Sequence, residues 1–419
     1  MNLSVHKLAS KIHRFFYLPK YNKTIGTVLY RIKLYFYWKK LPQKIAAMRS
    51  KPKIRVLFVA GGIRTWKAMP LFLSMTKHSR FEPIIGPNTN PKYPDQKAPL
   101  LSFISENGYD YIDLDTNKIS DCKPDLVVYD SPYTSVYSNG IAFDKNLDNV
   151  FCGCDYCINI TKHIVHLEHP WYDYCWQFYV EHEDVADRKR EILGKRARNI
   201  RVTGVPIQDV LMQPKENFDD PWKDKTGKKR IIYAPHHSFK GANGDGIEFA
   251  TFLQFGEVMQ ELAVKYQDKI TIAFKPHPYL YLRLLKIWGK EKTDVYYNKW
   301  QEMSNTQFEN GEYYGLFKYS DAIIHDCASF IIEYLYINNP SLYLVSESNN
   351  LDDMFDFVRD GFECYEHAKK ADDIELFIQN VINGIDNKRS QRIQCINRQL
   401  LPPGGKTACD NIINSILTA

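Results

Sequence analysis

Short apolar runs that end in polar or glycine-containing turns recur along the chain. The run at residues 54–60 (IRVLFVA) ends in Gly61-Gly62, and DLVVY at residues 125–129 has the same character. Runs of about four to eight apolar residues indicate strands buried on both faces of a parallel sheet. Between them lie segments with apolar residues at helical spacing, such as residues 247–266. The alternation predicts an α/β protein with two doubly wound, Rossmann-like domains facing a cleft.

Three predicted strands in the second half of the chain end in polar turns, at residues 234–238 (APHHS), 275–278 (KPHP) and 325–329 (HDCAS). The carboxyl ends of parallel strands share one edge of a sheet, where open α/β folds hold ligands. The side chains expected at this edge are His236, His237, Ser238, Lys275, His277, His325, Asp326 and Ser329. This set suits an anionic, phosphate-rich ligand. The alternative is that each histidine is a loop or core residue.

The segment after the third turn is expected to form a helix at residues 330–337, which Asn338-Asn339-Pro340 ends because proline cannot continue a helix. A phosphate would be favoured near Ser329 by free backbone N–H groups and the helix dipole. Alternatively, Asp326 and Ser329 only cap this helix.

The length of 419 residues is that of more than one ordinary domain. The predicted segments are a basic leader at 1–52, a first domain at 53–205, a second at 206–395 and a returning helix at 396–419. A polar stretch at residues 213–229, rich in Lys, Asp and Pro, is interpreted as the hinge or linker.

The net charge of +6 is unevenly distributed, since no acidic residue occurs before Glu82. Basic residues of the leader alternate with aromatic ones such as Phe36 and Trp38, while Arg31 and Lys33 interrupt its best apolar run. A spanning helix is therefore not expected, and the pattern favours binding to the surface of an anionic membrane. The alternatives are a helix packed on the body or a nucleic-acid-binding arm, and nothing else in the chain supports nucleic acid.

The nine cysteines show no regular framework spacing and no secretory signal is visible, which indicates free thiols in a reducing compartment. Cys152, Cys154, Cys157 and Cys175, with the nearby histidines, could be metal ligands, although the C-x-C spacing is tight for zinc, or the cysteines could simply be buried thiols. No spaced acidic pair marks a metal site, so neither a metal nor a cofactor is expected to be required.

The polar turns carry a family resemblance. YAPHHS at residues 233–238, FKPHP at 274–278 and HDCASFIIEYLY at 325–336 resemble the CDP-glycerol:poly(glycerophosphate) glycerophosphotransferases, as do TGVPIQDVL at 203–211 and GGKTACDNI at 404–412. The resemblance implies a GT-B fold whose second domain binds the nucleotide donor. It also implies that His277 and Ser329 contact the diphosphate and that Glu333 meets the ribose.

The sequence departs from this family in the first domain. Many members carry a Trp-His-Gly-Thr-Pro-Leu-Lys motif whose histidine is a candidate base, and residues 151–157 (FCGCDYC) stand at the corresponding place. Asp155 is the first candidate to replace that base, with His163, His166 and His169 as further candidates. The alternative is that all four are surface or packing residues.

The predicted function is phosphotransfer from CDP-glycerol, or another CDP-polyol, to a cell-surface glycan or lipid-linked acceptor, with release of CMP. The protein would act at the cytoplasmic face of the cell membrane, with His277 as the main catalytic group. One alternative is a glycosyltransferase of the same fold that uses CMP-sialic acid or CMP-Kdo. Another is a catalytically inactive, membrane-associated assembly protein.

Overall fold

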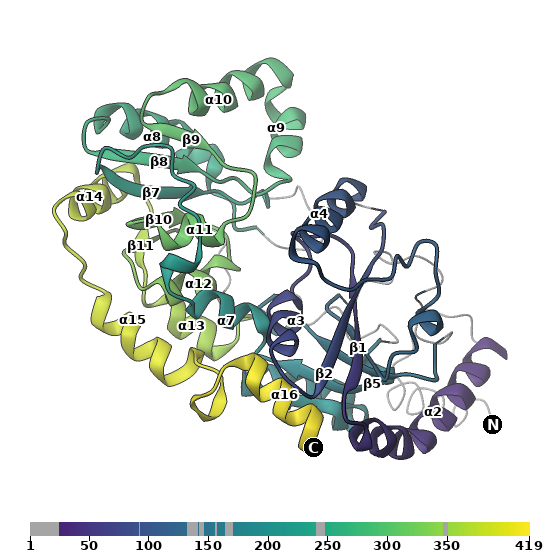
Figure 1. The fold of residues 1–419 in the computed structure, drawn as a ribbon. Helices are drawn as coiled ribbons and strands as arrows, with labels where there is room; N and C mark the ends of the chain where they lie inside the picture. The colour runs from purple at the N-terminus through teal and green to yellow at the C-terminus, as the bar shows by residue number, and fades with distance from the viewer. Residues whose placement is uncertain are drawn as a thin grey trace, which may run out of the picture. The chain divides into compact units, whose positions relative to one another are not determined.

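The structure is a computed structural model that describes residues 25–91, 93–131, 141, 146–155, 157–163, 171–239, 248–346 and 351–419. The chain forms two compact units: unit 1 is Met1–Asp209 with Pro402–Ala419, and unit 2 is Val210–Leu401. The sequence placed these two boundaries at residues 205 and 395, a few residues earlier. Each unit contains one six-stranded sheet (Figure 1).

The sheet of unit 1 is parallel, with the strand order β2-β1-β3-β4-β5-β6. Its strands are β1 (Ile54–Ala60), β2 (Phe81–Pro87), β3 (Leu126–Tyr129), β4 (Val150–Cys154), β5 (Cys175–Val180) and β6 (Ile200–Val202). All residues of β3, β4 and β5 are buried, which explains their continuous apolar runs. The chain order reverses between β1 and β3, and such a switch point opens a crevice at the carboxyl edge.

The helices of unit 1 are α2 (Ile25–Ser50), α3 (Met69–Thr76), α4 (Lys97–Asn107), α5 (Trp171–Tyr174), α6 (Glu183–Leu193) and α16 (Ala408–Thr418), while α7 (Pro206–Met212) contains the unit boundary. Short 3-10 turns occur at Pro94–Gln96, Ile119–Cys122 and Gly194–Asn199. The last helix, α16, lies beside α3 although the two are far apart in sequence (Figure 1).

Helix α2 packs on unit 1 through one of its faces. Tyr37 and Leu41 are buried, and the Tyr37 ring lies 5.9 Å from that of Phe151 in β4. The Tyr30 hydroxyl and the Trp38 indole N–H both donate hydrogen bonds to Asp173, at 2.7 Å and 2.8 Å. The alternative of a helix packed on the body is therefore correct for residues 25–50, while residues 1–24 lie outside the described part. No described helix is both long and apolar enough to span a membrane.

The sheet of unit 2 is also parallel, in the order β12-β11-β10-β7-β8-β9. Its strands are β7 (Lys229–Ala234), β8 (Ile270–Phe274), β9 (Thr306–Phe308), β10 (Ala322–His325), β11 (Ser341–Leu344) and β12 (Glu366–Ala368). This is the order of a dinucleotide-binding fold, and its switch point falls between β7 and β10.

The helices of unit 2 are α8 (Phe252–Lys265), α9 (Leu280–Trp288), α10 (Lys290–Glu302), α11 (Tyr314–Lys318), α12 (Phe330–Glu333), α13 (Asp356–Phe362), α14 (Ala371–Ile382) and α15 (Arg389–Cys395). Shorter turns are Lys215–Asn217, Tyr334–Ile337, Ile396–Leu400 and, in unit 1, Pro403–Gly405. The core includes Phe274 of β8 stacked on Trp300 of α10, with ring centroids 4.9 Å apart.

Two expectations for unit 2 need correction. The predicted helix at residues 330–337 is one α-turn, α12, followed by a tighter 3-10 turn that ends at Asn338 in the left-handed conformation. The predicted linker at residues 213–229 packs on unit 2, because Trp222 is buried and its indole N–H donates to the Leu316 carbonyl at 3.3 Å. The polar composition of residues 213–229 predicted a linker, whereas the buried Trp222 side chain fixes this segment on unit 2.

Candidate functional site

Two of the predicted polar turns meet at the switch point of unit 2. His236 follows β7 and Asp326 follows β10, and these strands are neighbours in the sheet. The third turn follows β8, on the other side of β7, and the His277 N–H donates to the Pro235 carbonyl at 3.0 Å. The structure therefore brings the three turns to one edge, as expected.

Asp326 holds this edge together. It is fully buried, and its carboxylate accepts hydrogen bonds from the backbone N–H of His236 at 2.5 Å and from the N–H and hydroxyl of Thr251 at 2.6 and 2.8 Å. Burial raises the pKa of this carboxyl to about 6, although the three donors favour the ionised form. Asp326 is thus a residue that positions the two turns. The sequence had suggested that its carboxylate contacts the nucleotide substrate directly, which these hydrogen bonds do not favour.

His236, His237 and His277 form one cluster at the edge. The ring of His277 lies 4.1 Å from that of His237 and 4.9 Å from that of His236, measured between centroids. One nitrogen of each ring lies within 4.8 Å of the others. The rings are partly buried, so the cluster combines a low-dielectric environment with an accessible side.

The hydrogen bonds of the cluster fix where its protons lie. The Tyr279 N–H donates to Nδ1 of His277 at 3.1 Å, and the Ser238 N–H approaches Nδ1 of His236 at 3.3 Å. The Ser238 hydroxyl accepts from the Phe249 N–H and lies 2.8 Å from the same Nδ1, to which its own proton can be donated. A ring nitrogen that accepts an N–H carries no proton, so His236 and His277 carry theirs on Nε2.

These histidines are neutral. Burial lowers the pKa of His277 to about 2, with further lowering by His236, His237 and Lys275. Burial also lowers the pKa of His236 to about 3. A neutral imidazole with its proton on Nε2 is a hydrogen-bond donor, which suits the oxygens of an anionic ligand. The positive charge is provided by Lys275, which donates to the Gly311 carbonyl at 2.8 Å.

Ser329 directly precedes α12, and Glu333 is the last residue of this helix. Ser329 makes no capping hydrogen bond, and its hydroxyl lies 3.2 Å from Cys327 Sγ, so the helix-cap interpretation fails for this residue. Glu333 is 3% exposed and accepts a hydrogen bond from the Tyr313 hydroxyl at 2.6 Å. The ribose contact expected for Glu333 therefore requires Tyr313 to share or release the carboxylate.

His325 does not belong to this edge, contrary to the sequence interpretation. It is fully buried at the end of β10, where its ring lies 5.2 Å from that of Tyr343 and 5.3 Å from that of Tyr365. The side chain points into the core because successive residues of a strand face opposite sides.

Among the described residues, the group that could hold a metal ion is the cluster His236, His237 and His277. A metal ligand must present an unprotonated nitrogen, whereas the Nδ1 atoms of His236 and His277 already receive N–H groups. The arrangement therefore favours an anion over a cation. The cysteines are not part of such a group, and Cys152 Sγ accepts a hydrogen bond from the Tyr179 hydroxyl at 3.3 Å.

Unit 1 places acidic residues directly after its central strands. Asp155 follows β4, but it is 4% exposed and lies 3.1 Å from the fully buried Lys189 ammonium. It also accepts a hydrogen bond from the Asn159 amide at 2.7 Å. Asp155 is thus held by contacts within the fold, and its role as the free base stays a prediction.

Glu181, which follows β5, is the group that sequence reasoning missed. Its carboxylate accepts from the Asn159 N–H at 2.5 Å and the Asn159 amide at 3.1 Å. Burial, and secondarily Asp155, raise its pKa to about 7. The signal in the sequence was its place after an apolar run, equivalent to that of Asp155. Among the histidine candidates, His163 is exposed, and His166 and His169 lie outside the described residues.

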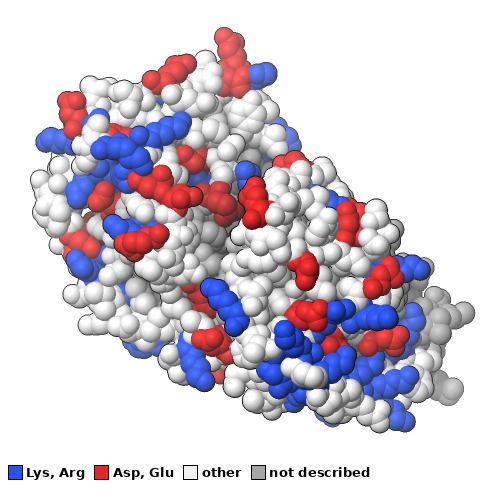
Figure 2. Space-filling view, in the orientation of Figure 1, with Lys and Arg blue, Asp and Glu red and all other residues white. Residues whose placement is uncertain are grey.

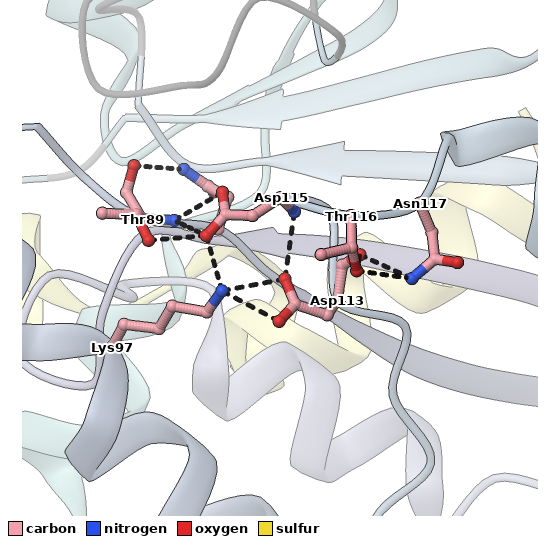
Figure 3. A network of polar contacts seen from close by, with 7 residues as sticks. Thr89, Lys97, Asp113, Asp115, Thr116 and Asn117 are labelled. Carbon is pink, nitrogen blue, oxygen red and sulfur yellow. Dashed lines mark hydrogen bonds and ion pairs between the residues drawn. The ribbon is translucent and has the colours of Figure 1, made fainter.

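A polar network beyond β2 completes the carboxyl edge of unit 1 (Figure 3). Lys97 at the start of α4 contacts Asp113 at 2.8 Å and Asp115 at 2.5 Å. Asp115 also accepts from the N–H and hydroxyl of Thr89, at 3.0 and 2.5 Å. These contacts tie the turn after β2 to α4, and they give the network a structural role.

Comparisons with known proteins agree with this architecture. No curated protein matches the chain. Among solved structures, the wall teichoic acid polymerase TagF is 13% identical, with 93% of this chain and 98% of that chain covered and a TM-score of 0.54. The UDP complex of MnaA from S. aureus is 15% identical over 87% of this chain and 96% of that chain, with a TM-score of 0.54. The putative UDP-N-acetylglucosamine 2-epimerase of Listeria monocytogenes is 14% identical over the same shares, with a TM-score of 0.56.

At these identities the solved structures show the fold alone, and they confirm the predicted α/β, GT-B-like fold. The sequence profile of the CDP-glycerol:poly(glycerophosphate) glycerophosphotransferases matches residues 168–418, which is more than half of the chain and includes all three polar turns. The chain therefore belongs to the CDP-glycerol:poly(glycerophosphate) glycerophosphotransferase family and is a transferase.

Proposed function

We propose that the protein transfers a polyol phosphate from a cytidine diphosphate polyol, CDP-glycerol in the first instance, to a hydroxyl group of a glycan or lipid-linked acceptor. The observation that carries this proposal is the histidine cluster at the switch point of unit 2, which presents Nε2–H donors beside Lys275. An anionic diphosphate is the ligand chemistry that this arrangement suits. Membership of the glycerophosphotransferase family supports the choice of donor.

In the proposed reaction the acceptor oxygen forms a bond to the phosphorus that bears the polyol. The bond from this phosphorus to the oxygen shared with CMP breaks, and CMP leaves with the electron pair. Negative charge grows on the leaving oxygen, and the Nε2–H groups of His277 and His236 donate to the phosphate oxygens. Because Pro276 and Pro278 flank His277 and its N–H is bonded to Pro235, little reorganisation is required.

The proton of the acceptor hydroxyl needs a base, and we assign this role to Glu181 in unit 1. Its raised pKa matches a group that both accepts and releases a proton near neutral pH. Asp155 then acts by holding Lys189 and Asn159 in place beside it. This assignment replaces the histidine of the family motif that the sequence lacks.

The outer face of α2 supports a site of action at an anionic membrane surface. Ile32, Tyr35 and Phe36 are 46%, 62% and 52% exposed, and exposed lysines at 33, 39 and 40 flank them. Figure 2 shows Lys and Arg side chains gathered over the part of unit 1 that contains α2. Exposed aromatic side chains beside lysines suit the headgroup region of a membrane. The acceptor would be presented there, on the cytoplasmic side.

A donor panel tests the proposal. CDP-glycerol or CDP-ribitol should raise the melting temperature, because a ligand that binds only the folded state stabilises it. The panel includes a CMP-sugar and UDP-N-acetylglucosamine, since proteins of this fold also bind UDP-linked compounds. Stabilisation by a CMP-sugar or UDP-sugar alone would overturn the choice of donor. Binding of CDP-glycerol without release of CMP in the presence of acceptor would favour the inactive assembly protein.

A further inference from the structure

A polar pocket lies at the amino edge of the unit 2 sheet, opposite the edge that carries the histidine cluster. It has a volume of about 770 Å³. Its lining includes Arg230 near the start of β7, Asp321 directly before β10 and Asn339 shortly before β11. The histidine cluster lies at the carboxyl edge of this sheet, after β7 and β8. Since β7 has six residues that each advance about 3.3 Å, the two edges are about 17 Å apart.

The lining of this pocket is strongly cationic. Five basic side chains line it against one carboxylate, that of Asp321: Lys215, Lys225, Lys228, Arg230 and Lys318. Three of these basic side chains form ion pairs with carboxylates that do not line the pocket. Lys225 and Arg230 contact Asp220 at 2.6 and 3.1 Å, and Lys228 contacts Asp224 at 3.6 Å.

Lys215 and Lys318 are different, because neither forms an ion pair within the described part of the chain. Lys318 is partly buried at the end of α11, and its ammonium donates to the Leu211 carbonyl at 2.5 Å. Lys215 lies over the Tyr319 ring at 5.8 Å. Burial without a neighbouring carboxylate lowers the pKa of Lys318 to about 8. A cation in this position gains an opposite charge only when an anion enters the pocket.

We propose that this pocket binds phosphodiester groups of the polyol-phosphate chain that the enzyme extends. The inference rests on the proposed function for the identity of the chain, and on the two uncompensated lysines for the charge of the ligand. The hydroxyl groups of Ser320 and Tyr336 and the amide of Asn339 add polar groups to the wall for the polyol part. A chain held here remains attached to the protein after each transfer, which raises its effective concentration at the donor site.

The direct test measures binding of a short oligo(glycerol phosphate) to the full-length protein. The double variant Lys215→Met/Lys318→Met should weaken binding about tenfold, through loss of two charge-assisted contacts, and should reduce its dependence on salt. Lys215→Met alone, at an exposed position, should weaken it about threefold without affecting the fold. Lys299→Met, which removes an exposed lysine of α10, is the matched control and should change nothing.

Enzymatic extension provides a second readout. The double variant should add the first unit to a short acceptor at the wild-type rate and release shorter products. Wild-type affinity of the double variant for the oligomer would overturn the proposal. The proposal would also be overturned if the double variant lost binding to phosphatidylglycerol vesicles but still bound the oligomer. That result would assign the pocket to a lipid headgroup. Stabilisation by CDP-glycerol should be the same in all variants. Its absence from the wild type would instead refute the proposed function.

Discussion

The backbone N–H of Tyr279 donates a 3.1 Å hydrogen bond to Nδ1 of His277. The proton of this imidazole therefore lies on Nε2, and the ring is a donor that needs no charge to bind a phosphate oxygen. Pro276 and Pro278 hold the backbone on both sides.

His277→Ala should lower the rate of transfer by about 10²-fold, as loss of one preorganised donor does. The melting temperature without ligand should change little, because the ring is at the edge of the sheet and partly exposed. Steady-state CMP release measures the effect, with Lys299→Ala, at an exposed position of α10, as the control. A variant that melts earlier yet turns over normally would make His277 a packing residue.

The same histidines should make the unliganded protein less stable in mild acid. In the folded state His236 and His277 stay neutral down to a pKa of about 3 and about 2, whereas in the unfolded chain they take up protons below about 6.5. The unfolded state then binds more protons, so stability falls as the pH falls from about 6.5 toward 3, by up to about 1.4 kcal/mol per pH unit for each histidine.

His277→Asn should therefore flatten the curve of unfolding free energy against pH between about pH 6.5 and 5. Urea denaturation at a series of pH values measures it, with His163→Asn as the control. An unchanged slope would show that the ring is protonated in the folded protein.

Glu181→Gln should abolish the rise in rate as the pH passes through about 7, where the ionised carboxylate forms. The pH dependence of kcat distinguishes this from a structural effect, which would lower the rate equally at all pH values. Glu183→Gln, at an exposed position two residues later, is the control. A variant that keeps the wild-type pH profile would remove Glu181 as the proton acceptor.

The double substitution Tyr35→Ala/Phe36→Ala should reduce partition onto anionic vesicles at least about tenfold, since each ring buries apolar area in the headgroup region. Replacing Lys39 and Lys40 with glutamine should weaken partition and make it less sensitive to salt. Vesicle sedimentation measures both. Leu376→Ala, at an exposed leucine of α14, is the control. Unchanged sedimentation of the aromatic variant would exclude α2 as the membrane contact.

Asp115→Asn tests the network around Lys97. The hydrogen bonds from Lys97 and Thr89 lower the pKa of the Asp115 carboxyl, although burial opposes them. The Asp115 carboxylate therefore contributes to the free energy of unfolding at pH values above its ordinary pKa near 4. This contribution is lost as the pH falls through the lower pKa that the group has in the folded protein. The variant should lose about 1–2 kcal/mol of unfolding free energy at pH 7, and this loss should shrink as the pH falls below about 4. Asp148→Asn, at an exposed carboxylate, should show no such difference.

The sequence predicted the edge of unit 2 well because apolar runs define strand ends and parallel strands bring their ends together. It could not show which way each side chain points. His236 and His325 both stand near strand ends, yet one joins the cluster and the other is enclosed by Tyr343 and Tyr365. The role of Asp155 was not visible either, since Lys189 is 34 residues away in sequence and only the fold brings its ammonium to 3.1 Å.

Asp209 accepts hydrogen bonds from the N–H groups of Ala408 and Cys409, each at 2.7 Å. The whole of unit 2 is encoded between these residues. During synthesis, unit 2 can fold as one uninterrupted segment while unit 1 still lacks α16. Residues 408–418 must leave the ribosome before Arg49 and Gln177 can reach their partners on that helix. A premature stop codon shortly before residue 408 would therefore leave a folded unit 2 attached to an incomplete unit 1.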